Sequence, residues 1–222
     1  MSLLVYAIAA RGARVPRARG VNGERLQTTR IGALDVLVGE VRTPPRPSAR
    51  TLRRYDRVVR SFWERRAAVL PARFGTVMRD PAELEMTVRD RRDSLCQSLA
   101  MVRNRAQMTV RIVPGSGIRD PGSGGSRGSG RGRSRGRRYL EARARASRFD
   151  HVPEVVALRA AVRLLVRAER IEGRAGVATV YHLVPRSAAT RYLEAAGRAA
   201  ASAGFAVHAS GPWPAYAFAD TW

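Results

Sequence analysis

The chain has 222 residues, of which 45% are hydrophobic, and this is enough for one large domain or two small ones with sizeable cores. Its formal net charge is +23 with histidine counted as neutral. The sequence contains no lysine, so arginine supplies the positively charged side chains. No stretch approaches the roughly 20 apolar residues of a membrane-spanning helix, which excludes that class of protein.

The positive charge has two interpretations. A chain this basic is attracted to polyanions such as nucleic acid, anionic membrane surfaces or acidic proteins. A GC-rich genome, by contrast, replaces lysine with arginine throughout its proteins, which explains the choice of arginine but not its excess over acids. The sign of the charge is therefore informative, whereas the preference for arginine is not.

Cys96 stands alone, which excludes an internal disulfide and a thiolate metal cluster within one chain. A single cysteine fits a reducing cytosol. Because the residue lies in the helical stretch "SLCQSLA", flanked by core positions, we expect a small buried side chain rather than a nucleophile.

The first half of the chain begins with two apolar runs, Leu3–Ala9 and Ala33–Val41, which predict buried strands. The opening "MSLLVYAIAA" resembles a short secretory signal, but no positive charge precedes the apolar run, so a strand is the better interpretation. The polar, glycine-containing segment 11–32 predicts a loop with at most a short element. "TPPRPS" is a connector.

From Thr51 the apolar period becomes helical, with Leu52, Tyr55, Val59 and Phe62 on one face of a helix that ends before Pro71. "ARFGTVM" then returns to an extended pattern. A second helix starts at an Asp80 N-cap followed by proline, and a strand is predicted at "QMTVRIV", residues 107–113. The buried face of this second helix comprises Leu84, Val88, Leu95, Leu99 and Val102.

A glycine-, serine- and arginine-rich insert occupies residues 114–138 and cannot bury enough apolar surface to fold. Its "RGSGRGRSRGRR" resembles disordered segments that bind RNA, although aromatic residues do not alternate with the arginines. The other interpretation is a solubilising linker. A salt-dependent gel shift that disappears on deletion of the insert would favour RNA binding.

After the insert, helices are predicted at 139–148 and 153–172, and a strand at 177–184. Ser187 is expected to cap an alanine-rich helix that stops at Gly204. The segments "FAVHA" and "AYAFA" are predicted as two strands joined by the turn "SGPWP".

This order of elements predicts an α+β fold with two domains. An N-terminal α+β domain is expected at residues 1–105. A C-terminal, modified ferredoxin-like domain is expected at 106–222, with the insert at about 114–138 as a disordered segment within it.

The sequence offers no set of residues for catalysis. His151, His182 and His208 lack metal-ligand spacing, and acids such as Glu169 are expected to form ion pairs with arginines on solvated helix faces. No nucleophile motif or phosphate-binding loop is present. We therefore predict a protein that is not an enzyme and has no catalytic, cofactor-binding or metal-binding residues.

Three stretches together resemble one family. "VLPARFGTVMRDPAEL" resembles the "LPLRFGTVF" segment of the gas vesicle protein F/L family (GvpF/GvpL), and "SGPWPAYAF" is similar to its C-terminal "GPWPPYSF". "SLLVYAIA" and "IGALDVLVGEV" occupy the places of its first two strands, and "YLEARA" resembles the segment after its variable loop. The chain departs from the family pattern at Tyr55, Gln107 and Arg111, where the family has histidine, an acid and lysine.

The resemblance implies a non-enzymatic accessory protein of gas vesicle formation, located in the cytoplasm and at the gas vesicle. Members are thought to bind the small, hydrophobic shell protein as an assembly factor or chaperone, together with other gas vesicle accessory proteins, and some are minor components of the vesicle. No small-molecule substrate, cofactor or membrane partner is expected. The alternative function is nucleic-acid binding through the Arg/Gly-rich insert.

A partner that delays assembly of an apolar shell protein must offer a complementary apolar or aromatic surface. Aromatic residues and arginine dominate the energetics of many interfaces, so we select Arg73, Phe74, Trp213 and Tyr216 as partner-binding candidates. Phe74 and Tyr216 are expected in strands and therefore in the core. Trp213, between two prolines, is expected on an exposed turn.

Overall fold

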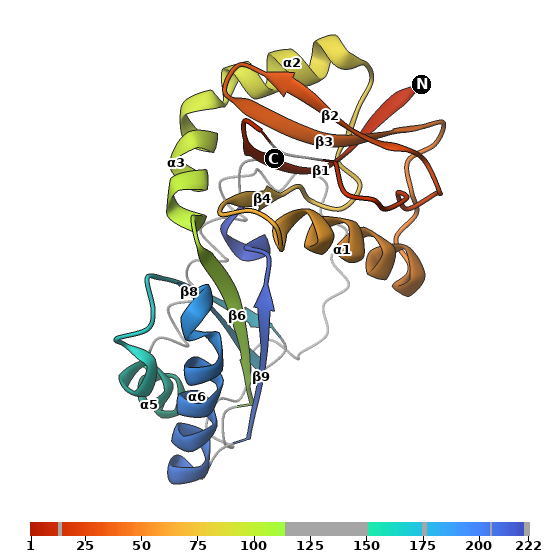
Figure 1. The fold of residues 1–222 in the computed structure, drawn as a ribbon. Helices are drawn as coiled ribbons and strands as arrows, with labels where there is room; N and C mark the ends of the chain where they lie inside the picture. The colour runs from red at the N-terminus through yellow and green to blue at the C-terminus, as the bar shows by residue number, and fades with distance from the viewer. Residues whose placement is uncertain (13–14, 114–150, 175–176, 205, 220–222) are drawn as a thin grey trace, which may run out of the picture. The chain divides into compact units, whose positions relative to one another are not determined.

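The computed structural model describes residues 1–12, 15–113, 151–174, 177–204 and 206–219 (Figure 1). The predicted insert at 114–138 and the predicted helix at 139–148 lie outside these residues. The fold is mixed helix and sheet with two sheets, as the α+β prediction requires.

The chain forms two compact units, and the first of them is discontinuous in sequence. It comprises Met1–Gln107 together with Trp213–Trp222, whereas the second comprises Met108–Pro212. The domain bounds expected from the sequence, 1–105 and 106–222, stay a prediction. The segment from Trp213 onward, however, groups with the first unit and not with the predicted C-terminal domain, because Tyr216 packs against the core of the first unit.

The sheet of the first unit is built around its most buried strand, β1. The order is β2-β3-β1-β4, and the short strand β5 also pairs with β1. Every residue from Leu3 to Ala9 is buried, so this strand must be covered on both faces of the sheet. The strands are β1 (Ser2–Ala10), β2 (Leu26–Ile31), β3 (Leu34–Val41), β4 (Val69–Pro71) and β5 (Val77–Met78).

Strand β2 occupies part of the segment that the sequence predicts as a loop. It pairs antiparallel with β3 from Leu26 opposite Gly39 to Ile31 opposite Leu34. Gly32 closes this hairpin with a φ of 58°, a conformation that glycine adopts without a steric penalty. Only Leu26 and Ile31 of this strand are buried, so the segment lacks the apolar run by which a buried strand is predicted.

Three helices cover the sheet. Figure 1 shows α1 (Ala49–Trp63) along one face and α2 (Pro81–Asp90) on the other, followed by α3 (Arg92–Val102). The predicted Asp80 cap is present, with the Glu83 amide donating to the Asp80 carboxylate at 2.8 Å. The predicted second helix is broken at Arg91, where φ is −109° and ψ is 10°.

The prediction that Cys96 is buried is wrong, because its side chain is exposed. The buried stripe of α3 consists of Leu95, Leu99 and Val102. Since successive residues of a helix point about 100° apart, the residue after Leu95 turns away from this stripe. An apolar neighbour in sequence therefore does not bury Cys96.

The second unit has the order β-α-β-β-α-β among its described elements, which is the ferredoxin-like order, and its sheet order is β7-β8-β6-β9. Buried residues of β6, β8, α5 and α6 form its core. The elements are β6 (Arg105–Ile112), α5 (Pro153–Val162), β7 (Ala168–Arg174), β8 (Val177–Pro185), the 3-10 turn η1 (Arg186–Ala188), α6 (Ala189–Ala203) and β9 (Val207–Trp213).

Several predictions for this half need correction. The helix expected at 153–172 ends at Val162, and its second part forms β7. Helix α6 stops at Gly204 as predicted, with a φ of 66°, but no side chain caps its start, so Ser187 does not serve as the cap. Among the described residues, no helix is long and apolar enough to cross a membrane.

The closing segment also differs from its prediction. The expected "SGPWP" turn is the last part of strand β9, which runs to Trp213. The expected strand "AYAFA" contains the 3-10 turn η2 (Tyr216–Phe218). Proline at position 214 cannot donate a ladder hydrogen bond, and the chain leaves the sheet there.

Candidate partner-binding site

All four predicted partner-binding residues belong to the first unit. Arg73 and Phe74 lie in the turn between β4 and β5, Tyr216 lies in η2, and Trp213 ends β9. Phe74 and Tyr216 are thus not in strands, and Trp213 is not on an exposed turn. Phe74, Trp213 and Tyr216 are all half-buried.

The turn that carries Phe74 is fixed by its backbone. The amide of Thr76 donates to the carbonyl of Arg73 at 3.1 Å, and Gly75 has a φ of 84°. The Phe74 ring meets the Tyr55 ring edge to face, with centroids 5.3 Å apart. Such a pair contributes about 0.5–1.5 kcal/mol beyond the apolar area that it buries. One edge of Phe74 is thereby anchored while part of the ring stays exposed.

Tyr55 forms the floor of the site. Its hydroxyl lies 2.7 Å from the carbonyl of Ala72 and 3.1 and 3.2 Å from those of Tyr6 and Val5. Burial raises the pKa of the Tyr55 phenol, so the group stays protonated and donates. Its ring stacks on Tyr6 with centroids 5.1 Å apart. The floor is therefore held on one side by backbone and on the other by a second aromatic ring.

The closing segment is held against α1 by side chains. The Tyr216 hydroxyl donates to Asp56 Oδ1 at 2.9 Å, and Arg60 Nε donates to Asp56 Oδ2 at 2.8 Å. The Arg60 guanidinium in turn lies 3.8 Å from the centroid of the Trp213 ring. Burial, and then the Asp56 charge, raises the pKa of Tyr216, which keeps the phenol as the donor.

A backbone contact completes this attachment. The amide of Ala217 donates to Gln107 Oε1 at 2.7 Å, and the Gln107 side chain is buried. The family resemblance of the sequence leads one to expect an acid at position 107 instead of glutamine. An amide oxygen accepts the same backbone hydrogen bond without placing a charge in the interior.

These contacts border a pocket of about 600 Å³. Arg73, Phe74 and Tyr216 line it, whereas Trp213 does not. Leu52 lies at its edge and is 46% exposed, although its position on the helical stripe predicts burial. We call this pocket the Phe74 groove; its lining is Leu52, Tyr55, Asp56, Pro71, Ala72, Arg73, Phe74, Tyr216 and Ala219.

Sequence reasoning missed Leu52, Asp56 and Arg60 as parts of the site. The spacing of Asp56 and Arg60 is that of an ion pair on one helix face, and this was visible in the sequence. The contact of Asp56 with Tyr216 and that of Arg60 with Trp213 were not visible in the sequence. No local pattern connects residues so far apart along the chain.

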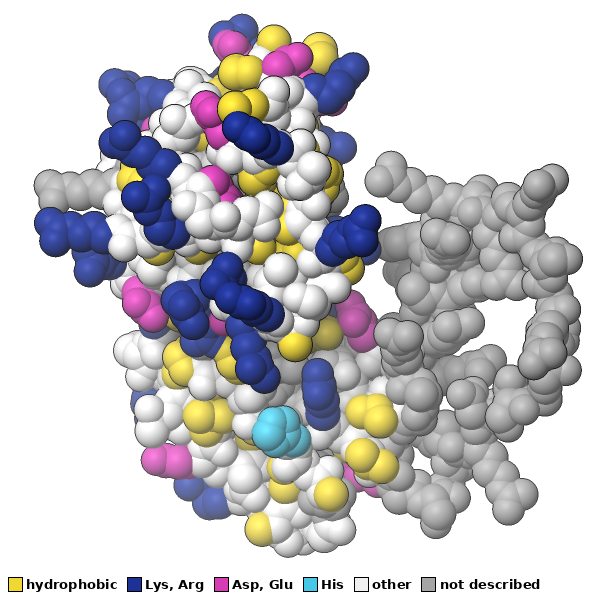
Figure 2. Space-filling model, turned by 90° about the vertical axis from the view of Figure 1, so that its right-hand side faces the viewer, with side chains coloured by type: hydrophobic (Ala, Val, Ile, Leu, Met, Phe, Trp, Pro, Cys, Tyr) yellow, Lys and Arg dark blue, Asp and Glu magenta, His cyan; other side chains and the backbone are white. Residues whose placement is uncertain are grey.

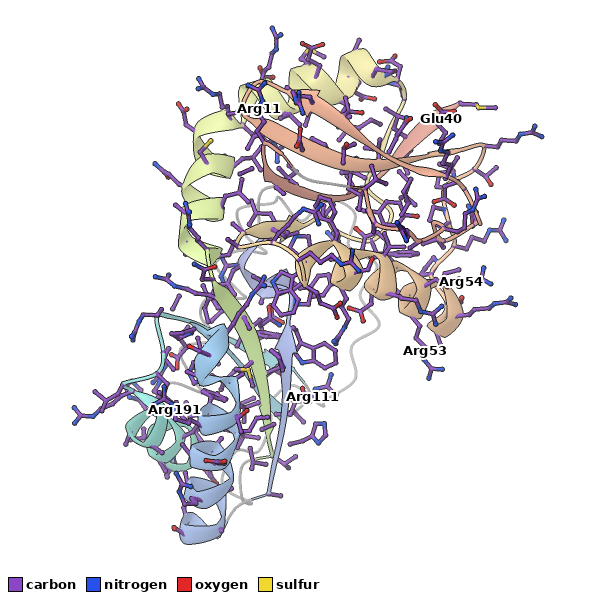
Figure 3. All side chains as sticks on the ribbon, in the orientation of Figure 1. Arg11, Glu40, Arg53, Arg54, Arg111 and Arg191 are labelled. Atoms are coloured by element: carbon purple, nitrogen blue, oxygen red, sulfur yellow. The ribbon has the colours of Figure 1, made fainter. Side chains whose placement is uncertain are left out.

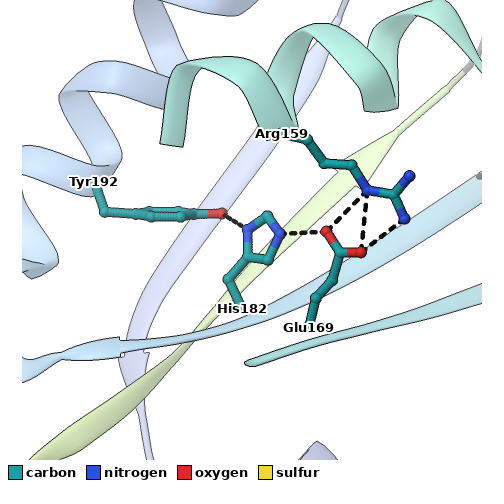
Figure 4. Close-up of polar contacts among 4 residues, drawn as sticks. All are labelled: Arg159, Glu169, His182 and Tyr192. Atoms are coloured by element: carbon teal, nitrogen blue, oxygen red, sulfur yellow. Dashed lines mark hydrogen bonds and ion pairs between the residues drawn. The ribbon is translucent and has the colours of Figure 1, made fainter. Parts of the chain in front are cut away.

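The second unit contains a separate polar cluster (Figure 4). His182 is buried; its Nδ1 lies 2.5 Å from the Tyr192 hydroxyl and its Nε2 lies 2.7 Å from Glu169 Oε2. Arg159 Nη2 donates to Glu169 Oε1 at 2.7 Å. Glu169 was expected on a solvated helix face, but it lies on β7, and its side chain is only 25% exposed.

This cluster stabilises the fold of the second unit. Burial opposes ionisation of Glu169, but hydrogen bonds from His182 and Arg159 outweigh it and lower the pKa to about 2. The cluster joins α5, β7, β8 and α6. Among the described residues, no group of three or more His, Cys, Asp or Glu side chains is placed to hold a metal ion.

The solved structures that are similar to this chain include two gas vesicle proteins. The chain superposes on the gas vesicle protein GvpF of Anabaena sp. PCC7120 with a TM-score of 0.72 and 14% identity, covering 99% of this chain and 98% of that one. For GvpF of Microcystis aeruginosa the TM-score is 0.73 at 14% identity, with 99% of each chain covered. At this identity the likeness establishes the fold.

Comparison with curated protein sequences finds no match. The family model described as gas vesicle synthesis protein GvpL/GvpF, however, matches residues 2–220, which is nearly the whole chain. The chain therefore belongs to the GvpL/GvpF family of gas vesicle synthesis proteins.

Proposed function

We propose that the protein is a non-enzymatic accessory factor of gas vesicle formation that binds the small, hydrophobic shell protein through the Phe74 groove. The match to the gas vesicle family over residues 2–220 carries this proposal. In the proposed role it acts in the cytoplasm as an assembly factor or chaperone, with other accessory proteins, and it can remain as a minor component of the vesicle.

The chemistry of the groove supports a partner with an apolar surface. Leu52 and Phe74 offer apolar side chains at its edge, and Tyr55 and Ala72 offer a buried floor. Burying apolar surface stabilises a complex by about 25 cal/mol per Å². Arg73 at the rim adds a cation that can pair with a polar edge of the partner.

Hydrogen bonds within the chain hold the floor and one wall of the groove in place. The hydroxyl of Tyr55 is held by backbone carbonyls, and Tyr216 is held by Asp56. A preformed site loses little conformational entropy on binding, which favours capture of an aggregation-prone chain. Trp213, packed on Arg60, is proposed to position this surface and not to contact the shell protein.

The test is capture of the shell protein by the full chain carrying Leu52→Ser and Phe74→Ser. Met86 on α2 is also exposed, at 57%, so Met86→Ser is the matched control for loss of exposed apolar surface. We expect capture to fall at least about tenfold in the groove variant and less than twofold in the control. Equal capture by both variants would contradict the groove as the binding surface.

Salt separates this function from nucleic-acid binding. Apolar capture persists at high salt, whereas phosphate contacts weaken steeply as salt rises. If the chain does not capture the shell protein but binds RNA tightly at low salt, the accessory function is wrong. Probing urea-washed vesicles for this chain then distinguishes a transient chaperone from a retained component.

A further inference from the structure

A second cavity in the first unit has a different chemistry. It encloses about 530 Å³ and shares no residue with the Phe74 groove. Arg11, Arg65, Arg66 and Arg103 line it, and small side chains, mostly alanine, form its floor. We call it the arginine pocket. No acidic residue is among the described residues that line it.

The four arginines come from three parts of the fold. Arg11 follows the end of β1, and Figure 3 labels it where the chain leaves that strand. Arg65 and Arg66 follow α1, and Arg103 follows α3. Like charges gathered around one hollow repel one another, so an anion that enters it is attracted by all of them.

Arg66 is the most firmly held of the four. Its guanidinium lies 3.8 Å from the centroid of the Phe62 ring, and its Nη1 donates to the Phe62 carbonyl at 2.5 Å. Burial lowers the pKa of Arg66, Asp35 opposes this shift, and the charge of Arg65 adds to it. A guanidinium fixed on an aromatic ring keeps its fork oriented before a ligand arrives.

Asp35 is the acid whose charge acts on Arg66. Asp35 is buried, with a side chain only 3% exposed. Its Oδ2 accepts from the amide of Gly12 at 2.7 Å, and its Oδ1 accepts from Arg30 Nε at 3.3 Å. The Asp35 carboxylate thus has hydrogen-bond partners of its own in Gly12 and Arg30. Its single charge does not balance the four arginines that line the pocket.

We propose that the arginine pocket binds the carboxylates of an acidic peptide segment supplied by a protein partner. Guanidinium groups match carboxylates in a forked, two-bond geometry. The alanine floor accepts short aliphatic side chains between the acids. A nucleic acid fits less well, because the described lining offers no aromatic ring on which a base could stack.

Cys96 supplies a reporter within the pocket. It is the only cysteine of the chain, it is exposed, and it lines the same cavity. A ligand seated in the pocket covers its thiol. The rate at which a neutral disulfide reagent modifies Cys96 therefore measures occupancy at this place, independently of total binding.

The experiment titrates a fluorescein-labelled peptide of alternating Glu and Ala, with a Gln/Ala peptide as the uncharged control. The pocket variant combines Arg11→Gln, Arg65→Gln and Arg103→Gln; all three residues are exposed. The matched control loses the same charge from exposed residues of α1 with Arg50→Gln, Arg53→Gln and Arg57→Gln. Circular dichroism verifies that both variants are folded.

We expect the Kd for the acidic peptide to rise at least about tenfold in the pocket variant and less than about threefold in the control. The acidic peptide should slow modification of Cys96 at least about threefold in the wild-type chain. Equal weakening in both variants, or no protection of Cys96, overturns the proposal. Stronger protection by a single-stranded RNA of equal charge also overturns it, because the ligand class is then wrong.

Discussion

The hydroxyl of Tyr216 donates to Asp56 at 2.9 Å, although the two residues are 160 positions apart in sequence. Asp56 is also bound by Arg60, which packs on Trp213. The closing segment is therefore joined to α1 by a continuous run of polar and aromatic contacts. A change in any member should loosen both the segment and the wall of the Phe74 groove.

Tyr216→Phe removes the hydroxyl and keeps the ring. Since hydrogen bonds to charged groups contribute about 1.5–3 kcal/mol, we expect a loss of about that size in the free energy of unfolding, measured by urea titration. Tyr181 is half-buried and its hydrogen bond to Glu172 is exposed, so Tyr181→Phe is the matched control and should cost less than about 0.5 kcal/mol. Equal losses of unfolding free energy in the two variants would show that the hydrogen bond to Asp56 stabilises the fold no more than the exposed one to Glu172.

Arg60→Ala removes both the ion pair with Asp56 and the contact with Trp213. We expect a loss of about 1–2 kcal/mol in unfolding free energy. Arg57→Ala, at an exposed position three residues earlier in the same helix, should cost less than about 0.5 kcal/mol. Arg60→Lys keeps the charge but not the flat guanidinium, and an intermediate loss would show that stacking contributes.

The Glu169 cluster predicts a pH dependence of stability. The folded-state pKa of Glu169 is about 2, below its ordinary value of 4.5, so its contribution is complete above about pH 5. It is lost as the pH falls from about 5 through 2, because the unfolded chain takes up the proton first. Unfolding free energies between pH 6 and 3 should fall more steeply for the wild-type chain than for Glu169→Gln. Parallel curves would contradict the prediction.

Gly39 leaves room for the side chain of Glu24, which reaches the hydroxyl of Tyr6. A Cβ at Gly39 would lie 2.7 Å from Glu24 Cγ, closer than side chains tolerate. We expect Gly39→Ala to cost about 1–3 kcal/mol in unfolding free energy. In a Glu24→Ala background the same substitution should cost much less. If Gly39→Ala costs as much in the Glu24→Ala background as in the wild-type chain, the clash is not with the Glu24 side chain.

The local rules of helices and strands predicted much of the fold. The buried strand at Leu3–Ala9, the Asp80 cap and the Gly204 stop each depend on neighbours within a few residues. Strand β7 was missed because it continues a helical pattern, and β2 because little of it is buried. Both strands are specified by the strand beside them in the sheet and not by their own sequence.

The candidate site was predictable only in part. The preference of interfaces for aromatic residues and arginine selected Phe74 and Tyr216, and both line the Phe74 groove. The same criterion selected Trp213, whose ring instead packs on Arg60. Which face of an aromatic residue is free depends on long-range contacts, and these have no period in the sequence.

The division of the chain also constrains the order in which the protein can be completed during synthesis. The ribosome makes the first 107 residues early, but Tyr216 and Ala217 belong to the same unit and are made only after the whole second unit. Until then Asp56 and Gln107 lack these two partners. These contacts of the first unit therefore form only after the second unit, which has more than a hundred residues, has been synthesised.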